Sequence, residues 1–145
     1  MPLNCEHVVP QSWFGKREPM RGDLHHLFAC EPRCNSFRGN LSYASFGDEK
    51  SMSGCGQKRG DRFEPLGGKG AVARATLYFL VRYPGEITQL TPEQLTLLRT
   101  WSADDPPADH ELHRNQAIFE VQGNRNPFID HPEWAPLVAF ERGLG

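Results

Sequence analysis

Apolar residues recur at helical spacing through the second half of the chain. Residues 69–83 (KGAVARATLYFLVRY) carry a broad apolar face that Pro84-Gly85 ends, so we predict a helix over 69–83. Thr91-Pro92-Glu93-Gln94 matches a capping box with proline in the first helical turn, which predicts a second helix from there to about Trp101. The second half of the chain is therefore expected to be a helical body.

Two more helices are expected towards the C-terminus. Residues 109–122 have helical spacing with Leu112, Ile118 and Val121 directed to the core, and Gly123 ends the pattern. Residues 132–142 predict a short final helix.

The first forty residues follow a different pattern. Two short apolar runs, 3–9 and 24–29, predict strands, and Pro10 ends the first of them. Pro32 then favours the start of a helix that Gly39-Asn40 would end. The order strand, strand, helix over about 3–40, followed by a helical body over 69–142, predicts a single α+β domain over 1–145.

The segment between these two parts, 41–68, is rich in glycine, serine and charged residues and is predicted to be a long loop. Cys5, Cys30, Cys34 and Cys55 all lie in the first 55 residues, which favours a local staple for this loop. A Cys30–Cys55 or Cys34–Cys55 disulfide is expected if the protein is exported, and structural zinc or free thiols otherwise. Zinc is the weaker interpretation, because only one short cysteine pair is present.

Composition and charge narrow the class of protein. Hydrophobic residues make up 38% of the 145, enough for one core. No apolar run approaches the roughly 20 residues that cross a bilayer, and the N-terminus lacks a basic start followed by an apolar stretch, so we predict no membrane span and no signal peptide in this chain. The formal net charge of -2 does not itself indicate nucleic acid.

The distribution of charge is more informative than its sum. The first 75 residues carry eleven Lys and Arg against eight Asp and Glu, whereas the remainder carries five against ten. This asymmetry permits a basic working face on an acidic body, and chance segregation of surface charge explains it equally well.

Glu6, His7 and Asn35 are the candidate residues for chemistry. Hydrolysis of a phosphodiester needs a base for the attacking water and positive charge against the phosphate oxygens. A neutral imidazole with a pKa of about 6.5 can be that base, and Mg²⁺ takes one or two protein oxygens of the kind that Glu6 and Asn35 offer. Adjacent strand residues point to opposite faces, so Glu6 and His7 share a site only if the strand end is irregular.

Five blocks of sequence around these residues occur in a specific order. They are NCEHVVPQSWF (4–14), DLHHLF (23–28), NSFRGN (35–40), GAVARA (70–75), and the C-terminal pieces RN (114–115) and QGNRNPF (122–128). A single Glu-His pair is a weak signal, whereas five ordered blocks between Asn4 and Trp134 are a specific one. The chain resembles the endonuclease I family, a branch of the ββα-metal (His-Me finger) nucleases.

The resemblance implies an α+β fold in which a ββα-metal motif precedes a mainly helical body. It implies a metal-dependent endonuclease with little sequence preference, acting on DNA, with RNA as a further candidate substrate, and leaving 5′-phosphate ends. His7 would be the general base, and Glu6 and Asn35 would bind one Mg²⁺ or Mn²⁺. A backbone carbonyl around Arg21 or Gly22 would orient the imidazole and leave its Nε2 free to accept a proton.

The resemblance also implies a basic side chain at the phosphate, for which Lys16, Arg17, Arg21 and Arg38 are candidates. Such contacts read the backbone rather than the bases. Nucleic acid is therefore the expected partner, and a monomer is the expected state.

The resemblance implies a secreted or periplasmic protein, although no signal peptide is expected in this chain. Two alternative functions follow from how the chain departs from the family. Members are secreted or periplasmic and usually carry a helical segment and a strand before the Glu-His pair, whereas five residues precede Glu6 here. The alternatives are a truncated relative that binds nucleic acid without cleaving it, and a toxin-like nuclease domain with an immunity partner.

Several polar residues are expected to have structural roles. On the strand predicted over 24–29, one of His25 and His26 would face inward, hydrogen-bonded, and the other outward. Asp23 would hold the preceding loop by accepting backbone N–H bonds. Glu111 and Arg114, three residues apart on one predicted helix, would form an ion pair.

Overall fold

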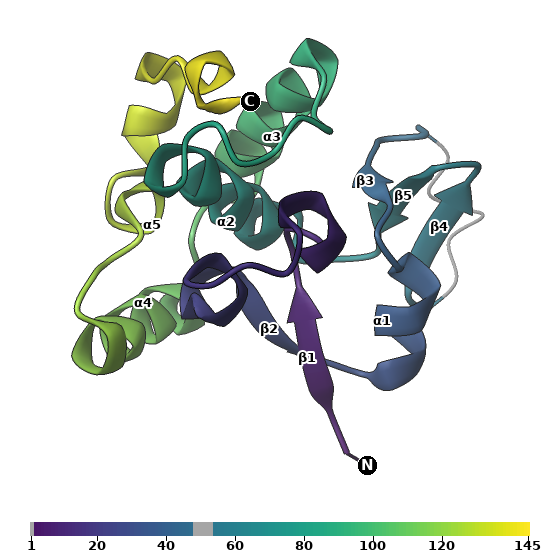
Figure 1. Cartoon of the computed structure of the whole chain (residues 1–145), viewed down its shortest axis with the longest axis horizontal. Coiled ribbons are helices and arrows are strands. Elements are labelled where there is room, and N and C mark those ends of the chain that lie inside the picture. Colours follow the sequence, from purple (N-terminus) through teal and green to yellow (C-terminus); the bar gives the residue numbers. More distant parts are fainter. Residues whose placement is uncertain (1, 48–53) are drawn as a thin grey trace.

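The computed structural model describes residues 2–47 and 54–145. Its front unit is the antiparallel pair β1 (Asn4–His7) and β2 (Leu27–Cys30), followed by α1 (Pro32–Arg38). Figure 1 shows this pair in the middle of the molecule, with α1 and a second small sheet on one side and the helical body on the other. The predicted order of strand, strand and helix is therefore present.

Local sequence explains the boundaries of α1 and β2. Pro32 stands in the first turn of α1, and Gly39 (φ 58°) ends the helix, as predicted. β2 begins later than the predicted strand, because the Asp23 carboxylate accepts the His25 amide and starts the 3-10 turn Leu24–His26. As a result His25 and His26 are both buried, and the prediction that one of them faces outward is wrong.

The predicted loop over 41–68 contains a sheet. Its strands are β3 (Ser42–Tyr43), β4 (Gly56–Arg59) and β5 (Arg62–Pro65), with β5 in the middle, parallel to β3 and antiparallel to β4. Gly60 (φ 57°) and Asp61 form the two-residue turn of the β4–β5 hairpin. The overlooked sequence signal was this two-residue turn, which begins with glycine and joins two short strands. Residues 48–53 of the predicted loop lie outside the described residues.

The helical body surrounds α2. Its elements are α2 (Lys69–Arg82), α3 (Pro92–Asp104), α4 (Asp109–Gln122), α5 (Pro127–Asp130) and the 3-10 segments Pro132–Leu137 and Phe140–Gly143. The predicted capping box of α3 is confirmed, with reciprocal bonds between Thr91 and Gln94. In Figure 1, α2 lies between β1–β2 and α3, with α5 at its side and α4 below it, and its long run of buried residues is the centre of the core.

Two expectations for the body are corrected by the structure. Ile118 of α4 is buried, but Leu112 (41% exposed) and Val121 (79% exposed) face solvent, because α4 contacts the body along a narrow strip. Glu111 pairs with Arg74 of α2 rather than with Arg114.

The other corrections concern Arg114 and the C-terminal segment. Arg114 donates to the carbonyls of Leu24 and Leu27 and stacks on Phe28. The single predicted helix over 132–142 is two 3-10 segments, broken at Val138. Within the described ranges no helix has the length and apolar character of a membrane span.

Candidate active site

His7, the last residue of β1, has its imidazole fixed by the backbone. Its Nε2 lies 3.0 Å from the carbonyl oxygen of Arg21, in the turn Met20–Gly22. A carbonyl can only accept, so Nε2 carries the proton and Nδ1 is left as the acceptor. The carbonyl comes from the predicted residue, but the free nitrogen is Nδ1 and not the predicted Nε2.

Burial keeps His7 in the form that a base requires. Partial burial lowers the pKa of His7 below its ordinary value, and the bond to the Arg21 carbonyl opposes that shift in part. The ring is therefore neutral near neutral pH, with one nitrogen available to take a proton.

Glu6 contacts α1, whereas the neighbouring His7 contacts the turn Met20–Gly22. Its Oε1 accepts from Nη1 of Arg38 at 2.5 Å, whereas its Oε2 is buried without a hydrogen-bond partner. Burial raises the pKa of Glu6, and the nearby Arg38 charge opposes this. A buried carboxylate oxygen without a partner is unusual, and a bound cation is one of the groups that can satisfy it.

Asn35, on α1, lies against β1. Its Nδ2 donates to Oδ1 of Asn4 (2.7 Å) and to the carbonyl of Cys5 (3.2 Å), which fixes the amide and leaves Oδ1 as its acceptor group. The structure thus brings Asn35 to the strand that carries Glu6 and His7.

These oxygens fit a hard divalent cation. One carboxylate oxygen without a partner and one neutral amide oxygen match the few protein ligands that Mg²⁺ typically takes. Among the residues that the structure describes, no three His, Cys, Asp or Glu side chains gather into a metal cluster. Residues that could hold a cation here are therefore Glu6 and Asn35.

Arg38 is not placed as a phosphate contact. Its side chain is 3% exposed and stacks on Tyr43. Besides Glu6, the guanidinium donates to the carbonyls of Leu41 (2.9 Å), Val8 (2.8 Å) and His7 (3.2 Å). The expectation that it reaches substrate is corrected, because β1 and α1 enclose it; instead it ties Glu6 to the strand end.

The other three candidate cations are exposed. Lys16 follows Gly15 in the loop between β1 and β2, has a left-handed backbone conformation (φ 56°) and is exposed. Arg17 pairs with Glu86, and Arg21 is the residue whose carbonyl binds His7. Their position on the loop that holds His7 keeps all three as candidates for the substrate contact.

Sequence reasoning expected one of His25 and His26 to be buried and hydrogen-bonded, but it did not place His26 against His7. Its ring is fully buried, donates from Nε2 to the Met20 carbonyl (2.7 Å) and meets the His7 ring edge to face at 5.5 Å. Burial lowers its pKa to about 4, so this histidine supports His7 as a neutral ring. The pair of histidines in 23–28 was the only sequence signal for it.

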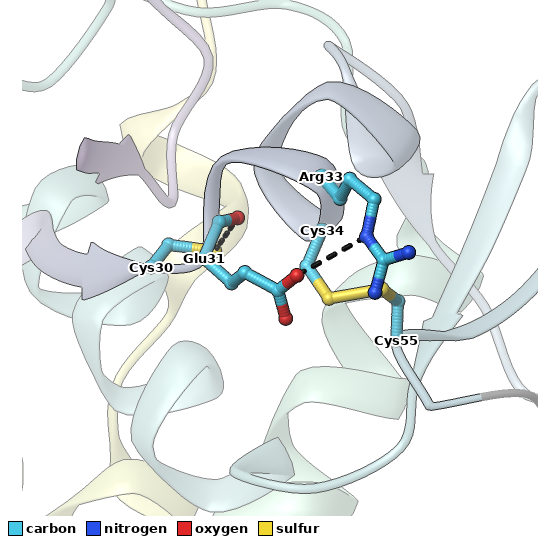
Figure 2. Close-up of a disulfide and its surroundings, with 5 residues drawn as sticks. All are labelled: Cys30, Glu31, Arg33, Cys34 and Cys55. Atoms are coloured by element: carbon cyan, nitrogen blue, oxygen red, sulfur yellow. Dashed lines mark hydrogen bonds and ion pairs between the residues drawn. A yellow bond between two sulfur atoms is a disulfide. The ribbon is translucent and has the colours of Figure 1, made fainter. Parts of the chain in front are cut away.

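A disulfide links α1, the helix that carries Asn35, to the small sheet. Cys34 of α1 bonds to Cys55, next to β4, while Cys5 and Cys30 are free. Figure 2 shows Cys30 on the far side of Glu31 from this bond, its thiol donating to the Glu31 carbonyl. Of the two expected disulfides, Cys34–Cys55 is the one present, and Cys30 is not part of it. The alternative of structural zinc is not the arrangement found for Cys34 and Cys55, because their sulfur atoms are bonded to each other.

Curated proteins of similar sequence match most of this chain. An extracellular ribonuclease of Bacillus subtilis (strain 168) is 38% identical over 153 residues, covering 93% of this chain and 53% of that protein. A periplasmic deoxyribonuclease of Aeromonas hydrophila is 30% identical over 152 residues, covering 88% of this chain and 63% of that protein. The chain therefore spans about half to two thirds of the length of these curated relatives.

The family comparison covers most of the chain. The model of the family described as Endonuclease I matches residues 2–133, which include Glu6, His7 and Asn35 and run from β1 into the segment after α5. With a match of that extent, in addition to the ordered sequence blocks, this chain belongs to the endonuclease I family.

Proposed function

We propose that this chain is a metal-dependent endonuclease of the His-Me finger type that hydrolyses phosphodiester bonds in DNA and RNA with little sequence preference. The observation that carries the proposal is the neutral His7 ring, held by the Arg21 carbonyl with Nδ1 as its acceptor. The similarity to a ribonuclease and to a deoxyribonuclease supports both substrate types.

In this proposal His7 takes a proton from the attacking water at Nδ1. The bond from Nε2 to the Arg21 carbonyl stabilises the positively charged imidazolium that results. The water oxygen bonds to phosphorus and the bond from phosphorus to the 3′ oxygen breaks. The phosphate stays on the 5′ end, and the 3′ oxygen leaves as a hydroxyl after taking a proton from solvent.

Glu6 and Asn35 would hold one Mg²⁺ or Mn²⁺ through oxygen atoms. When bound, the cation neutralises the charge that develops on the phosphate oxygens. Arg38 keeps Glu6 in place by its ion pair and by bonds to the carbonyls of His7 and Val8. The role of this chain is thus to fix one base and two oxygen ligands along a short strand and a short helix.

Exposed cations on the loop between β1 and β2 would hold the substrate backbone. Lys16, Arg17 and Arg21 are exposed and precede β2, and the phosphates are the part of a nucleic acid that cationic side chains fit. Binding through phosphates predicts weak sequence preference and an affinity that falls steeply with salt.

The site of action that we propose is outside the cytoplasm, with the protein acting as a monomer. Relatives are named extracellular or periplasmic. The Cys34–Cys55 disulfide is typical of proteins that fold in oxidising compartments.

The test is cleavage of supercoiled plasmid and of a structured RNA by the purified chain, with Mg²⁺ or with EDTA. We expect cleavage to require the metal and to fall at least about 10²–10⁴-fold in His7→Ala, the range for loss of a general base. His110→Ala, which removes an exposed histidine of α4, is the matched control and should cleave normally.

Each failure has a separate meaning. Binding of plasmid without cleavage by the unaltered chain would support the non-cleaving relative instead of the enzyme. Cleavage that survives His7→Ala would leave the nuclease in place and remove His7 as its base.

A further inference from the structure

The orientation of His7 depends on a carbonyl in a short surface turn. Met20–Gly22 is a single 3-10 turn, and Arg21, whose carbonyl accepts from His7, is exposed. A turn of three residues does not fix the place of its own carbonyl to the few tenths of an ångström that a catalytic hydrogen bond requires. Contacts from the rest of the molecule must do so.

Asp23, two residues after Arg21, has an unusually complete set of contacts. It is 4% exposed. Its Oδ2 accepts from the hydroxyls of Tyr78 (2.6 Å) and Tyr83 (2.7 Å), and its Oδ1 from Nε2 of Gln122 and the amide of His25 (both 2.9 Å). Four donors occupy the four acceptor positions of one carboxylate.

The donors belong to different parts of the helical body. Tyr78 lies in α2, Tyr83 directly follows α2, and Gln122 is the last residue of α4. Gln122 also accepts the Leu24 amide through Oε1 (2.9 Å), so the segment directly after the turn is held on two sides. Asp23 thus connects the turn to both helices.

Asp23 is an anion in spite of its burial. Burial raises the pKa of this carboxyl, but the bonds from Tyr78, Tyr83, Gln122 and the His25 amide together bring it below its ordinary value. No Lys or Arg pairs with Asp23 among the described residues. The charge is stabilised by hydrogen bonds from neutral donors, and these bonds fix the direction of the carboxylate because each requires its own alignment.

We propose that Asp23 is a positioning residue for His7: by anchoring the turn to α2 and α4 it places the Arg21 carbonyl that keeps Nδ1 of His7 as the proton acceptor. The proposal rests on the proposed function of His7 as a base. Two further contacts act on the same turn, the bond from His26 to the Met20 carbonyl and the bond from the Gly22 amide to Glu18.

Asp23→Asn is the variant that tests this role, because it keeps the shape and replaces one acceptor with a donor. Tyr78 already accepts from Nδ2 of Asn124 (2.8 Å), so its own proton points at Asp23. In either orientation of the new amide, its Nδ2 would face two donors, the tyrosine hydroxyls or the His25 amide with Nε2 of Gln122. We expect kcat on plasmid to fall about 10- to 100-fold, with KM changed less than about twofold.

A direct readout of the ring is ¹⁵N NMR of histidine-labelled protein at a pH where His7 is neutral, with His7→Gln to assign its signals. The unaltered protein should show His7 protonated at Nε2. Asp23→Asn should shift this pattern towards a mixture of the two tautomers, because the carbonyl that selects one of them has moved.

Glu111→Gln is the matched control, since it also neutralises a buried carboxylate that joins α2 to α4 but contacts Arg74 instead of the turn. It should leave the His7 signals unchanged. An equal loss of kcat in both variants, or unchanged His7 signals and kcat in folded Asp23→Asn, would overturn the proposal. If Asp23→Asn does not fold, Tyr83→Phe removes a single donor and should shift the same signals to a smaller extent; unchanged signals there would also overturn it.

If the unaltered chain cleaves nothing, the proposed function fails, and the His7 signals still decide the positioning role of Asp23.

Discussion

Two buried arginines, one in the front unit and one in the helical body, solve the same physical problem differently. Arg74 (1% exposed) meets Glu111 with two parallel bonds of 2.6 and 2.7 Å and also donates to the carbonyls of Ser102 and Asp105. Arg38 (3% exposed) has a comparable set of carbonyl partners but bonds to only one oxygen of Glu6.

The difference lies in what is left without a partner. Both oxygens of Glu111 are bonded, whereas Oε2 of Glu6 is buried without a partner. An unsatisfied buried acceptor costs about 1–3 kcal/mol of stability. Glu111 is therefore fully satisfied, whereas Glu6 retains an acceptor at the position where a catalytic cation would bind. Local rules of polar satisfaction are most often broken at functional sites.

The largest effect is expected from breaking the pair in the body. Arg74→Met should lower the free energy of unfolding by about 3–5 kcal/mol, because it leaves Glu111 buried without its counter-charge. Urea unfolding at neutral pH measures this loss. A loss below about 1 kcal/mol would mean that Glu111 finds water or another partner.

Acid should weaken the front unit through His26. The unfolded chain takes up a proton at this histidine near pH 6.5, whereas the folded protein does so only at about 4. The contribution of neutral His26 to the free energy of unfolding is therefore fully present above about pH 6.5. It falls by about 3 kcal/mol as the pH drops from about 6.5 to about 4.

His26→Gln separates this histidine from the others, since the amide keeps a donor near the Met20 carbonyl. The difference in unfolding free energy between about pH 7.5 and pH 4.5, from urea titrations, should be smaller in the variant. An equal pH dependence in both proteins would assign the effect to His7, His25 or Asp23 instead.

Breaking the pair in the front unit should have a smaller effect than in the body. Arg38→Met should lower the free energy of unfolding by about 2 kcal/mol, because Glu6, whose pKa burial already raises, can take a proton once its counter-charge is gone. The same urea titrations apply, and the loss should shrink at lower pH. A loss as large as that of Arg74→Met would contradict the contrast between the two arginines.

The smallest effect is expected at the capping box of α3, which lies in the helical body away from the candidate active site. Thr91→Ala removes one side of the capping box of α3 and should lower the free energy of unfolding by about 1 kcal/mol. Plasmid cleavage should be unchanged, so a clear loss of kcat would show that α3 affects the front unit more than its contacts suggest.

The sequence by itself determined the elements whose signals are local. Proline and glycine set the ends of α1, Thr91 and Gln94 set the start of α3, and helical spacing set α2 and α4 within one or two residues. Glu6, His7 and Asn35 could be named as candidates because residues of the right chemistry stand in ordered blocks. These features depend on neighbours in the chain, which a pattern can reveal.

Tertiary structure decided which groups meet. Sequence could not show that Arg38 is enclosed beside Glu6, that Glu111 pairs with Arg74 across 37 residues, or that Cys34 and not Cys30 bonds to Cys55. The choice of Nδ1 as the free nitrogen of His7 depends on a carbonyl 14 residues away. Burial and hydrogen-bond partners arise only when distant segments pack together, and they set which charges are available for chemistry.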